Sequence, residues 1–274
     1  MEVFEKLYEA FGLRGDFADV LLIATLVITR VVPVVFVTPF LGGKVVPPET
    51  RIGLAAAIAI LVFPFAQDAM VGDVPRNAAV FLAMMLKETF IGFVIGFVAA
   101  ELFYAMEIAG RLLDVMRGSN MAEAQVPELQ LRASPIGDFN FQLLLVVFCA
   151  LNGHGYFIES VAESFRIVPV DGWPVVHNGF AALMDQILVY TNDIITTAFL
   201  LVFPGLLAVF MVDIVFGMFN RIAPQLNAYF MAMPVKAMTG LAMFMFAMGM
   251  MITQMSFKLE RALLFGREII NAFG

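Results

Sequence analysis

The amino-acid sequence predicts an all-α, membrane-type protein, and three observations support this fold class. Apolar residues make up 61% of the chain and charged residues 14%, against about 45–50% and about 25% in soluble domains. The apolar residues gather in long stretches that need lipid or neighbouring apolar helices around them. No stretch alternates apolar and polar residues as a half-buried strand does. We therefore expect long, kinked helices arranged as membrane-type helical hairpins.

The N-terminal part of the chain is expected to contain a surface helix followed by a first helical half. Residues 1–16 have the pattern of an amphipathic helix that lies on a membrane surface or docks on a partner. In residues 17–116, a first helix is expected to begin near Asp16, where that residue could cap it, and to kink at Pro33.

The second apolar segment, residues 52–66, is expected to end around Pro64. At 1.5 Å per residue it reaches roughly 22 Å, short of the ~30 Å hydrocarbon core of a bilayer. This segment is therefore as compatible with a re-entrant or protein-buried helix as with a spanning helix.

Residues 78–116 are expected to form one very long helix, or two helices joined near Gly92 and Gly96. The spacing of these two glycines permits close packing against another helix. Glu107 and Arg111 are four residues apart, in the order that favours a helical ion pair.

The remainder of the chain is expected to form a polar loop and a second helical half. The polar loop covers residues 117–135, and the second half covers residues 136–255. Prolines at 204, 224 and 234 are expected to punctuate that half. Residues 256–274 are expected to form a separate C-terminal amphipathic helix, so that residues 1–274 make up one subunit.

Composition excludes several classes of function. The formal net charge of −7 argues against nucleic acid, which selects basic surfaces. Cys149 stands alone in an apolar run, which predicts a small core residue rather than a disulfide or thiolate site. His154 and His177 are too few and too isolated for a histidine metal site, and no catalytic or phosphate-binding motif is found. We expect neither enzymatic activity nor a cofactor or metal.

Ionisable residues inside apolar segments are functional candidates, because burying a charge in a membrane is costly. In the simpler interpretation they pair across helices or lie at helix ends near water. In the alternative, some of them line an aqueous path. The residues concerned are Arg30, Lys87, Glu88, Glu101, Asp213, Arg221 and Lys236.

Methionines gather near the C-terminus, from Met231 to Met255. Because methionine suits irregular gaps, the simpler interpretation is adaptable core filler. The alternative is a deformable surface that seals around varied polypeptides. Lysine and arginine are scattered almost singly, so the charge bias of the loops predicts no clear topology. We therefore favour helices that are buried against partner chains, because the charge bias is weak, the second segment is short and prolines are numerous.

Several distinctive motifs follow one another along the chain. The most specific motif is Asn220-Arg221-Ile222-Ala223-Pro224-Gln225-Leu226-Asn227. The others, in order, are Arg30 with Pro33, Arg51 with Gly53, Gly92 with Gly96, Gly110 with Asp114, Ser134-Pro135, Asn152-Gly153-His154, Ser164-Phe165 and Pro234 with Lys236. This ordered set resembles the FliR/SctT family of type III secretion export-gate subunits, over roughly residues 17–260.

The resemblance implies a hetero-oligomeric export gate at the bacterial inner membrane, with part of the assembly raised into the periplasm. The implied partners are SctR- and SctS-type subunits (FliP and FliQ in flagella), an SctU/FlhB-type switch protein, unfolded secreted polypeptides and membrane lipid. A family plug loop corresponds to Arg117, Gly118, Ser119, Asn120, Met121 and Ala122. Packing against other subunits is expected for Arg30, Gly92, Gly96, Arg221, Pro224 and Asn227.

Residues 114–118 and 134–137 resemble the injectisome branch (SctT, formerly YscT or HrcT), which implies a role in virulence. Flagellar FliR is the alternative branch. A small-solute transporter and a membrane enzyme are the alternatives outside this family.

Overall fold

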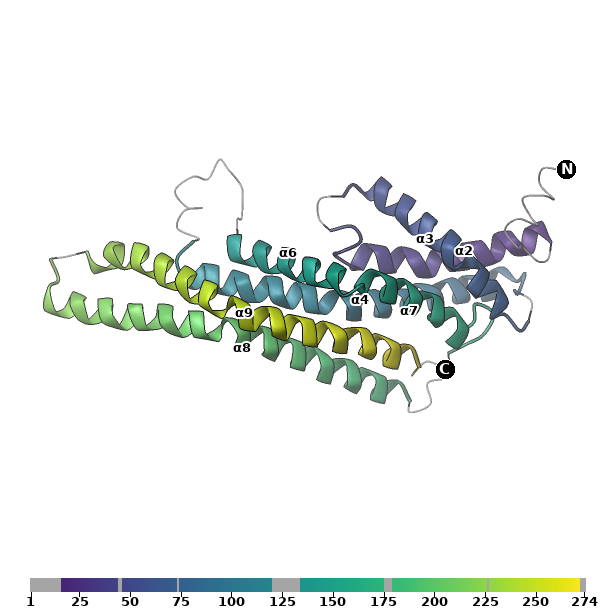
Figure 1. Cartoon of the computed structure of the whole chain (residues 1–274). Helices are drawn as coiled ribbons and strands as arrows, with labels where there is room; N and C mark the ends of the chain where they lie inside the picture. The colour runs from purple at the N-terminus through teal and green to yellow at the C-terminus, as the bar shows by residue number, and fades with distance from the viewer. Residues whose placement is uncertain are drawn as a thin grey trace. The chain divides into compact units, whose positions relative to one another are not determined.

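The computed structural model of the protein describes residues 16–43, 46–72, 74–119, 134–174, 179–225 and 227–271. Within these ranges every regular element is an α-helix, which confirms the predicted all-α class. The expected N-terminal helix lies almost entirely outside the described residues. The helices, shown in Figure 1, are α2 (Phe17–Val37), α3 (Pro48–Asp68), α4 (Ala78–Met116), α6 (Pro135–Ala150), α7 (Gly153–Ile167), α8 (Gly179–Ile222) and α9 (Ala228–Asn271).

Five of these helices are long and apolar enough to cross a membrane, namely α2, α3, α4, α8 and α9. The shorter helices α6 and α7 pass the same test only as a pair, which gives up to six spans among the described residues. Asn152, between them, has a positive φ of 56°, as expected for a turn at this point. The protein is therefore a multi-pass membrane protein.

The expectation of a short second helix is wrong. Helix α3 begins with Pro48 at its first position, where the missing N–H costs nothing, and contains 21 residues. Its length is roughly 31 Å, sufficient for a hydrocarbon core. The helix passes through Pro64, a residue that membrane helices tolerate because their neighbours compensate for the lost hydrogen bond. The length of this helix therefore gives no reason to bury it against a partner.

Two further expected breaks are also absent. Helix α8 is 44 residues long and continues through Pro204. Helix α9 is also 44 residues long and continues through Pro234. The expected separate helix from residue 256 onward is instead the last part of α9. Helix α2 begins directly after Asp16, as expected, but the Asp16 side chain makes no capping hydrogen bond.

The chain divides into two compact units, to which α4, α8 and α9 each contribute different parts. The first unit contains residues 1–100, 152–188 and 260–274, and thus includes α2, α3 and α7. In this unit α2 and α3 pack against each other. Its core includes the buried side chains of Leu26, Val31, Val62, Ile91, Val98 and Phe165.

The second unit contains residues 101–151 and 189–259, and thus includes α6. The buried ring of Phe103 on α4 packs edge-on against Phe148 of α6, with 5.7 Å between ring centroids. Its core also includes Leu102, Met106, Leu113, Leu144 and Val209. Cys149 is exposed, which contradicts the expectation of a core residue. It belongs to the outer face of α6, which in a membrane protein can be as apolar as the core.

The glycine pair of α4 allows this helix to approach α2 very closely. A Cβ atom added to Gly92 would lie 2.0 Å from the carbonyl oxygen of Arg30. One added to Gly96 would lie 3.1 Å from the Cα of Val34. Both glycines therefore serve contact between helices of this chain, as small residues do in membrane bundles.

Replacing Gly92 by alanine should force α2 away from α4, because the atom nearest to the new Cβ is backbone. We expect a loss of about 1–3 kcal/mol in stability and a lower melting midpoint of the detergent-purified protein. The matched control is Gly53→Ala in α3, whose added Cβ meets nothing within 4 Å. That change should stabilise the helix by up to about 1 kcal/mol. Equal midpoints for both variants would contradict the close approach.

Candidate functional site

Arg30 is the largest fully buried side chain of the protein's described residues and joins three helices. Its Nε donates a hydrogen bond to the Glu88 carboxylate of α4. Its two terminal nitrogens donate to the carbonyl oxygens of Ser164 and Val168, each at 2.8 Å, where α7 ends. The guanidinium also lies 4.1 Å from the centroid of the Phe165 ring. Arg30 therefore acts within this chain, and its side chain has no exposed surface toward another subunit.

Lys87 extends the same buried cluster. Its Nζ lies 2.7 Å from a carboxylate oxygen of Glu88. It also donates hydrogen bonds to the carbonyl oxygens of Pro169, Val170 and Gly172, at 3.1, 3.1 and 2.8 Å. Cations are favourable here because the end of a helix and the turn after it present unpaired carbonyl oxygens. Two cations and one carboxylate thus fix the turn after α7 against α4.

Ion pairs also join α8 to α9 in the second unit, where the two helices run antiparallel (Figure 1). Asp213 pairs with Lys236, and Asp193 pairs with Lys258 at 2.7 Å. Together with the Arg30 cluster, these contacts confirm that most ionisable residues of the apolar helices pair across helices. Glu101 differs: it is buried beside Thr191, and no described lysine or arginine pairs with it.

Asp114, near the end of α4, holds both ends of the polar loop. One carboxylate oxygen accepts a hydrogen bond from Arg117 Nε at 2.8 Å. The other accepts from the Ser134 hydroxyl and from the backbone N–H of Ile136, both at 2.8 Å. Asp114 itself is buried. We call this set of contacts, formed by Asp114, Arg117, Ser134 and Ile136, the Asp114 anchor.

The Asp114 anchor follows from the local sequence. Pro135 occupies the first position of α6, so the next backbone N–H groups are free to bind an acceptor. A carboxylate is stabilised there because the N-terminus of a helix carries partial positive charge. Gly110 permits the approach, since an added Cβ would lie 2.6 Å from the Cα of Gly137.

The expected plug residues begin directly after this anchor. Arg117 belongs to the anchor, and Gly118 adopts a positive φ of 89° that favours glycine. The backbone N–H of Ser119 donates to the carbonyl oxygen of Asp114 at 3.0 Å. Asn120, Met121 and Ala122 lie outside the described residues. The plug role of these residues stays a prediction.

The expected packing residues near the second proline motif lie where α8 ends and α9 begins. Arg221, Pro224 and Asn227 are all exposed. Among the described residues, no side-chain hydrogen bond or ion pair of Arg221 is found. Contact of these residues with another subunit stays a prediction.

The second unit carries a large apolar surface on α8 and α9. Exposed side chains include Phe210, Met218, Phe230, Met238 and Phe246. The interpretation of the methionines as core filler holds for Met251 and Met255, which are buried. It is wrong for the four exposed ones, Met231, Met238, Met245 and Met250. A surface of this kind needs lipid or protein to cover it.

Several functional contacts were not anticipated. Asp114 and Ser134 appear in the recognised motifs, but nothing in the sequence brought the two side chains together. A buried polar residue near the end of an apolar helix, followed by Ser-Pro, is the signal that could have indicated the anchor. Asp171 was also missed; one of its carboxylate oxygens accepts hydrogen bonds from the backbone N–H groups of Val71 and Gly72.

Among the described residues, no group of three or more His, Cys, Asp or Glu side chains is placed to hold a metal ion. Long apolar helices, internal ion pairs and a large apolar outer surface are typical of a helical, multi-pass membrane protein. The chain belongs to the family described as "Bacterial export proteins, family 1", whose model matches residues 21–262. The resemblance to the FliR/SctT family is therefore confirmed.

Relatives from both branches of this family resemble the chain. "Yop proteins translocation protein T" of Yersinia pestis is 30% identical over 237 residues, which cover 84% of this chain and 88% of the relative. "Flagellar biosynthetic protein FliR" of Escherichia coli is 26% identical over 215 residues, covering 78% and 79%. "Secretion system apparatus protein SsaT" of Salmonella typhimurium is 32% identical over 161 residues, covering 57% and 59%.

Removing the Arg30 side chain should destabilise the first unit strongly. Arg30→Ala leaves Glu88 buried with only Lys87 as counter-charge, and breaking a buried pair costs about 3–5 kcal/mol. The matched control is Arg166→Ala, which removes an exposed pair with Glu163 worth about 0–1 kcal/mol. The melting midpoint in detergent measures both. A midpoint for Arg30→Ala equal to that of the control would contradict the buried cluster.

Proposed function

We propose that this chain is the SctT-type subunit of an injectisome export gate, which forms part of the inner-membrane path for unfolded proteins. In this proposal it assembles with SctR- and SctS-type subunits, contacts an SctU-type switch protein, and stands partly on the periplasmic side. Its role is structural rather than catalytic. The observation that carries the proposal is the Asp114 anchor, which closes a polar loop at the end of long apolar helices.

The anchor supports a gating role because it fixes the two chain positions, Arg117 and Ser134, between which the proposed plug lies. Asp114, Ser134 and the first N–H groups of α6 are buried and mutually hydrogen-bonded. In this proposal the segment that follows Gly118 is the resting obstruction, which yields to a substrate and returns afterwards while the anchored helix ends stay in place.

The outer apolar surface of α8 and α9 supports assembly with other helical subunits. Subunits in a membrane associate through close packing rather than through a hydrophobic driving force. Exposed phenylalanine and methionine side chains offer large, adaptable contacts for such packing. In this proposal the exposed residues Arg221 and Asn227, which flank the connection between these helices, fix its orientation against a partner.

Flagellar export is the alternative function within the same family. The identity to the Yersinia protein is 30%, while flagellar relatives reach 29% in Buchnera aphidicola and 26% in Escherichia coli. The genes that neighbour this reading frame separate the branches: needle-type secretion genes support the proposal, and flagellar structural genes overturn the branch assignment.

Deleting residues 117–122 should open the resting gate and increase ion leak across the inner membrane. Asp114→Asn should give a smaller leak, because hydrogen bonds to a charged group contribute about 1.5–3 kcal/mol and their neutral counterparts less. Leak is measured by the ion-dependent growth arrest and depolarisation of cells that express the assembled gate.

The control for this experiment is Glu107→Gln, which removes an exposed ion pair with Arg111 on the same helix. It should leave the leak at the wild-type level. If the deletion variant assembles and its ion leak equals that of the wild type, the plug assignment is wrong.

Arg221→Ala should weaken assembly with the SctR-type subunit, because the proposed contact loses a cation on an exposed turn. We expect a several-fold lower yield of the complex on native gels, in line with the roughly 1–2 kcal/mol of a moderate interface contact. The control is Arg111→Ala, an exposed arginine whose pair is local to α4. Equal yields for the two variants would show that the turn does not bind this partner.

A further inference from the structure

Glu101, on α4 in the second unit, is a buried carboxyl group without a counter-charge among the described residues. It is 8% exposed, and both of its carboxyl oxygens are buried. No described residue donates a hydrogen bond of normal geometry to either oxygen. The hydroxyl group of Thr191 on α8 is the polar group beside them. A negative charge here would be costly, because burial removes its hydration and no cation replaces it.

The other buried carboxyl groups of the described chain show what an ionised group needs in this interior. Glu88 lies between two cations, since Arg30 donates to it and the Lys87 Nζ is 2.7 Å away. Asp114 pairs with Arg117 at 2.7 Å and accepts further hydrogen bonds at the start of α6. The third buried carboxyl group has one neighbouring hydroxyl in place of these donors. Its surroundings therefore fit the neutral, protonated form.

The ionisable side chains of α8 and α9 do not supply the missing cation. Tyr190 is close enough to Glu101 for the two groups to interact electrostatically, but a phenol carries no positive charge. Lys258 of α9 pairs instead with Asp193 of α8, at 2.7 Å. The ionisable side chains on nearby parts of α4 and α6 are exposed, namely Tyr104, Asp138 and Cys149.

Apolar packing between α4 and α8 surrounds this carboxyl group. Residues three or four positions away along a helix share a face with the central residue. The side chains that share a face with Glu101 or Thr191 in this way are buried and apolar, namely Val98 and Ala105 on α4, and Ile194 and Ala198 on α8. Ionisation of Glu101 would therefore place a charge among apolar groups, and water could reach it only if the two helices separated.

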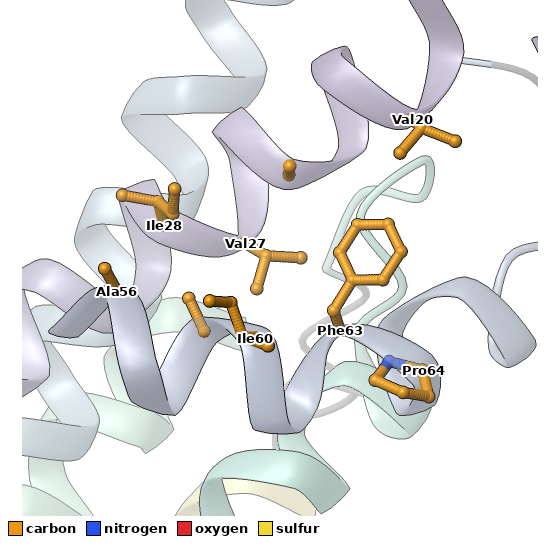
Figure 2. Close-up of a pocket in the computed structure, with 9 residues that line it drawn as sticks. Val20, Val27, Ile28, Ala56, Ile60, Phe63 and Pro64 are labelled. Carbon is orange, nitrogen blue, oxygen red and sulfur yellow. The ribbon is translucent and has the colours of Figure 1, made fainter. Parts of the chain in front are cut away.

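The groove between α2 and α3 in the first unit has a different character. It has a cavity volume of about 360 Å³, and only apolar side chains line it (Figure 2). Such a lining offers no group that could bind a proton or an ion. Glu101, in contrast, brings an ionisable group into an apolar contact.

We propose that Glu101 is a proton-binding site, which holds a proton while α4 and α8 are packed and releases it to water when this contact opens. The neutral carboxyl group needs no counter-charge, and its O–H can donate to the Thr191 hydroxyl oxygen. The contact between the two helices is thereby sensitive to pH. This inference rests on contacts within the second unit and does not require the proposed export function.

The test uses infrared spectroscopy of the full chain in lipid nanodiscs at neutral pH, where exposed carboxyl groups are ionised. A protonated carboxyl group has a C=O stretching band that carboxylates lack. We expect one such band in the wild-type protein. It should shift when the glutamate side chains carry an isotope label at the carboxyl carbon, and it should disappear in Glu101→Gln.

The matched control is Glu107→Gln on the same helix, where the glutamate pairs with Arg111. This variant should keep the band. Thr191→Val should shift the band, because the carboxyl group loses its neighbouring hydroxyl, whereas Thr197→Val on the same helix should not. The Thr197 hydroxyl donates to the backbone of its own helix.

Stability provides a second measurement. If Glu101 keeps its proton, the folded protein binds one proton more than the unfolded chain, whose glutamates ionise above about pH 4.3. Stability then falls as the pH rises above that value. Glu101→Gln cannot lose a proton, so its melting midpoint should fall less, by about 2–4 °C or more between mildly acidic and alkaline pH.

Absence of the band from the wild-type protein would show an ionised Glu101 and overturn the proposal, as would an unchanged band in Glu101→Gln. Parallel pH dependence of the two melting midpoints would also overturn it. Glutamine has the shape of the neutral carboxyl group, so Glu101→Gln should fold. A variant that fails to fold would show that the negative charge is required, which contradicts the proton-binding site.

Discussion

The buried ion pair between Arg30 and Glu88 constrains much of the first unit, because neither charge can lie alone in an apolar interior. The pair fixes α2 against α4, and the remaining Arg30 donors reach the carbonyl oxygens at the end of α7. Gly92 is compatible with this geometry only because it has no side chain where the Arg30 backbone passes. A charge, a glycine and a helix end therefore specify one arrangement that apolar packing alone would leave degenerate.

In the second unit, the carboxylate of Asp114 has the role that the Arg30 and Lys87 cations have in the first unit, because it binds a helix end. Asp114 binds the N-terminal N–H groups of α6, while the cations of the first unit bind the C-terminal carbonyl oxygens of α7. Both contacts satisfy backbone groups at helix ends with side chains that are buried within the chain. Most buried charges are therefore paired inside each unit, while many large apolar side chains remain exposed.

The sequence allowed the helices to be predicted, but not where several of them end. The range expected for α4, residues 78–116, agrees with the structure. The sequence predicts breaks at Pro64, Pro204 and Pro234, yet α3, α8 and α9 continue through them. A proline is a reliable break only where water competes for the freed carbonyl oxygen, and long membrane helices lack that competition.

Pairing partners were the least predictable part of the candidate site. Arg30, Lys87 and Glu88 were recognised as costly buried charges, but the carbonyl oxygens that bind the two cations come from residues 164–172 and are invisible in any local pattern. Exposure was equally hard to foresee: Cys149 and Met238 are exposed in a chain where inside and outside are both apolar. Hydrophobicity alone cannot separate the two environments.

The way in which Asp114 ties Arg117 to Ser134 also has an evolutionary consequence. Once both ends of a segment are fixed, the entropy of closing it grows only with the logarithm of its length, at about 0.6 kcal/mol for each doubling. Insertions and deletions between these two residues are therefore nearly neutral for folding. Folding alone therefore sets little limit on the length of this stretch, whereas it does constrain the aspartate and the Ser-Pro pair that bracket it.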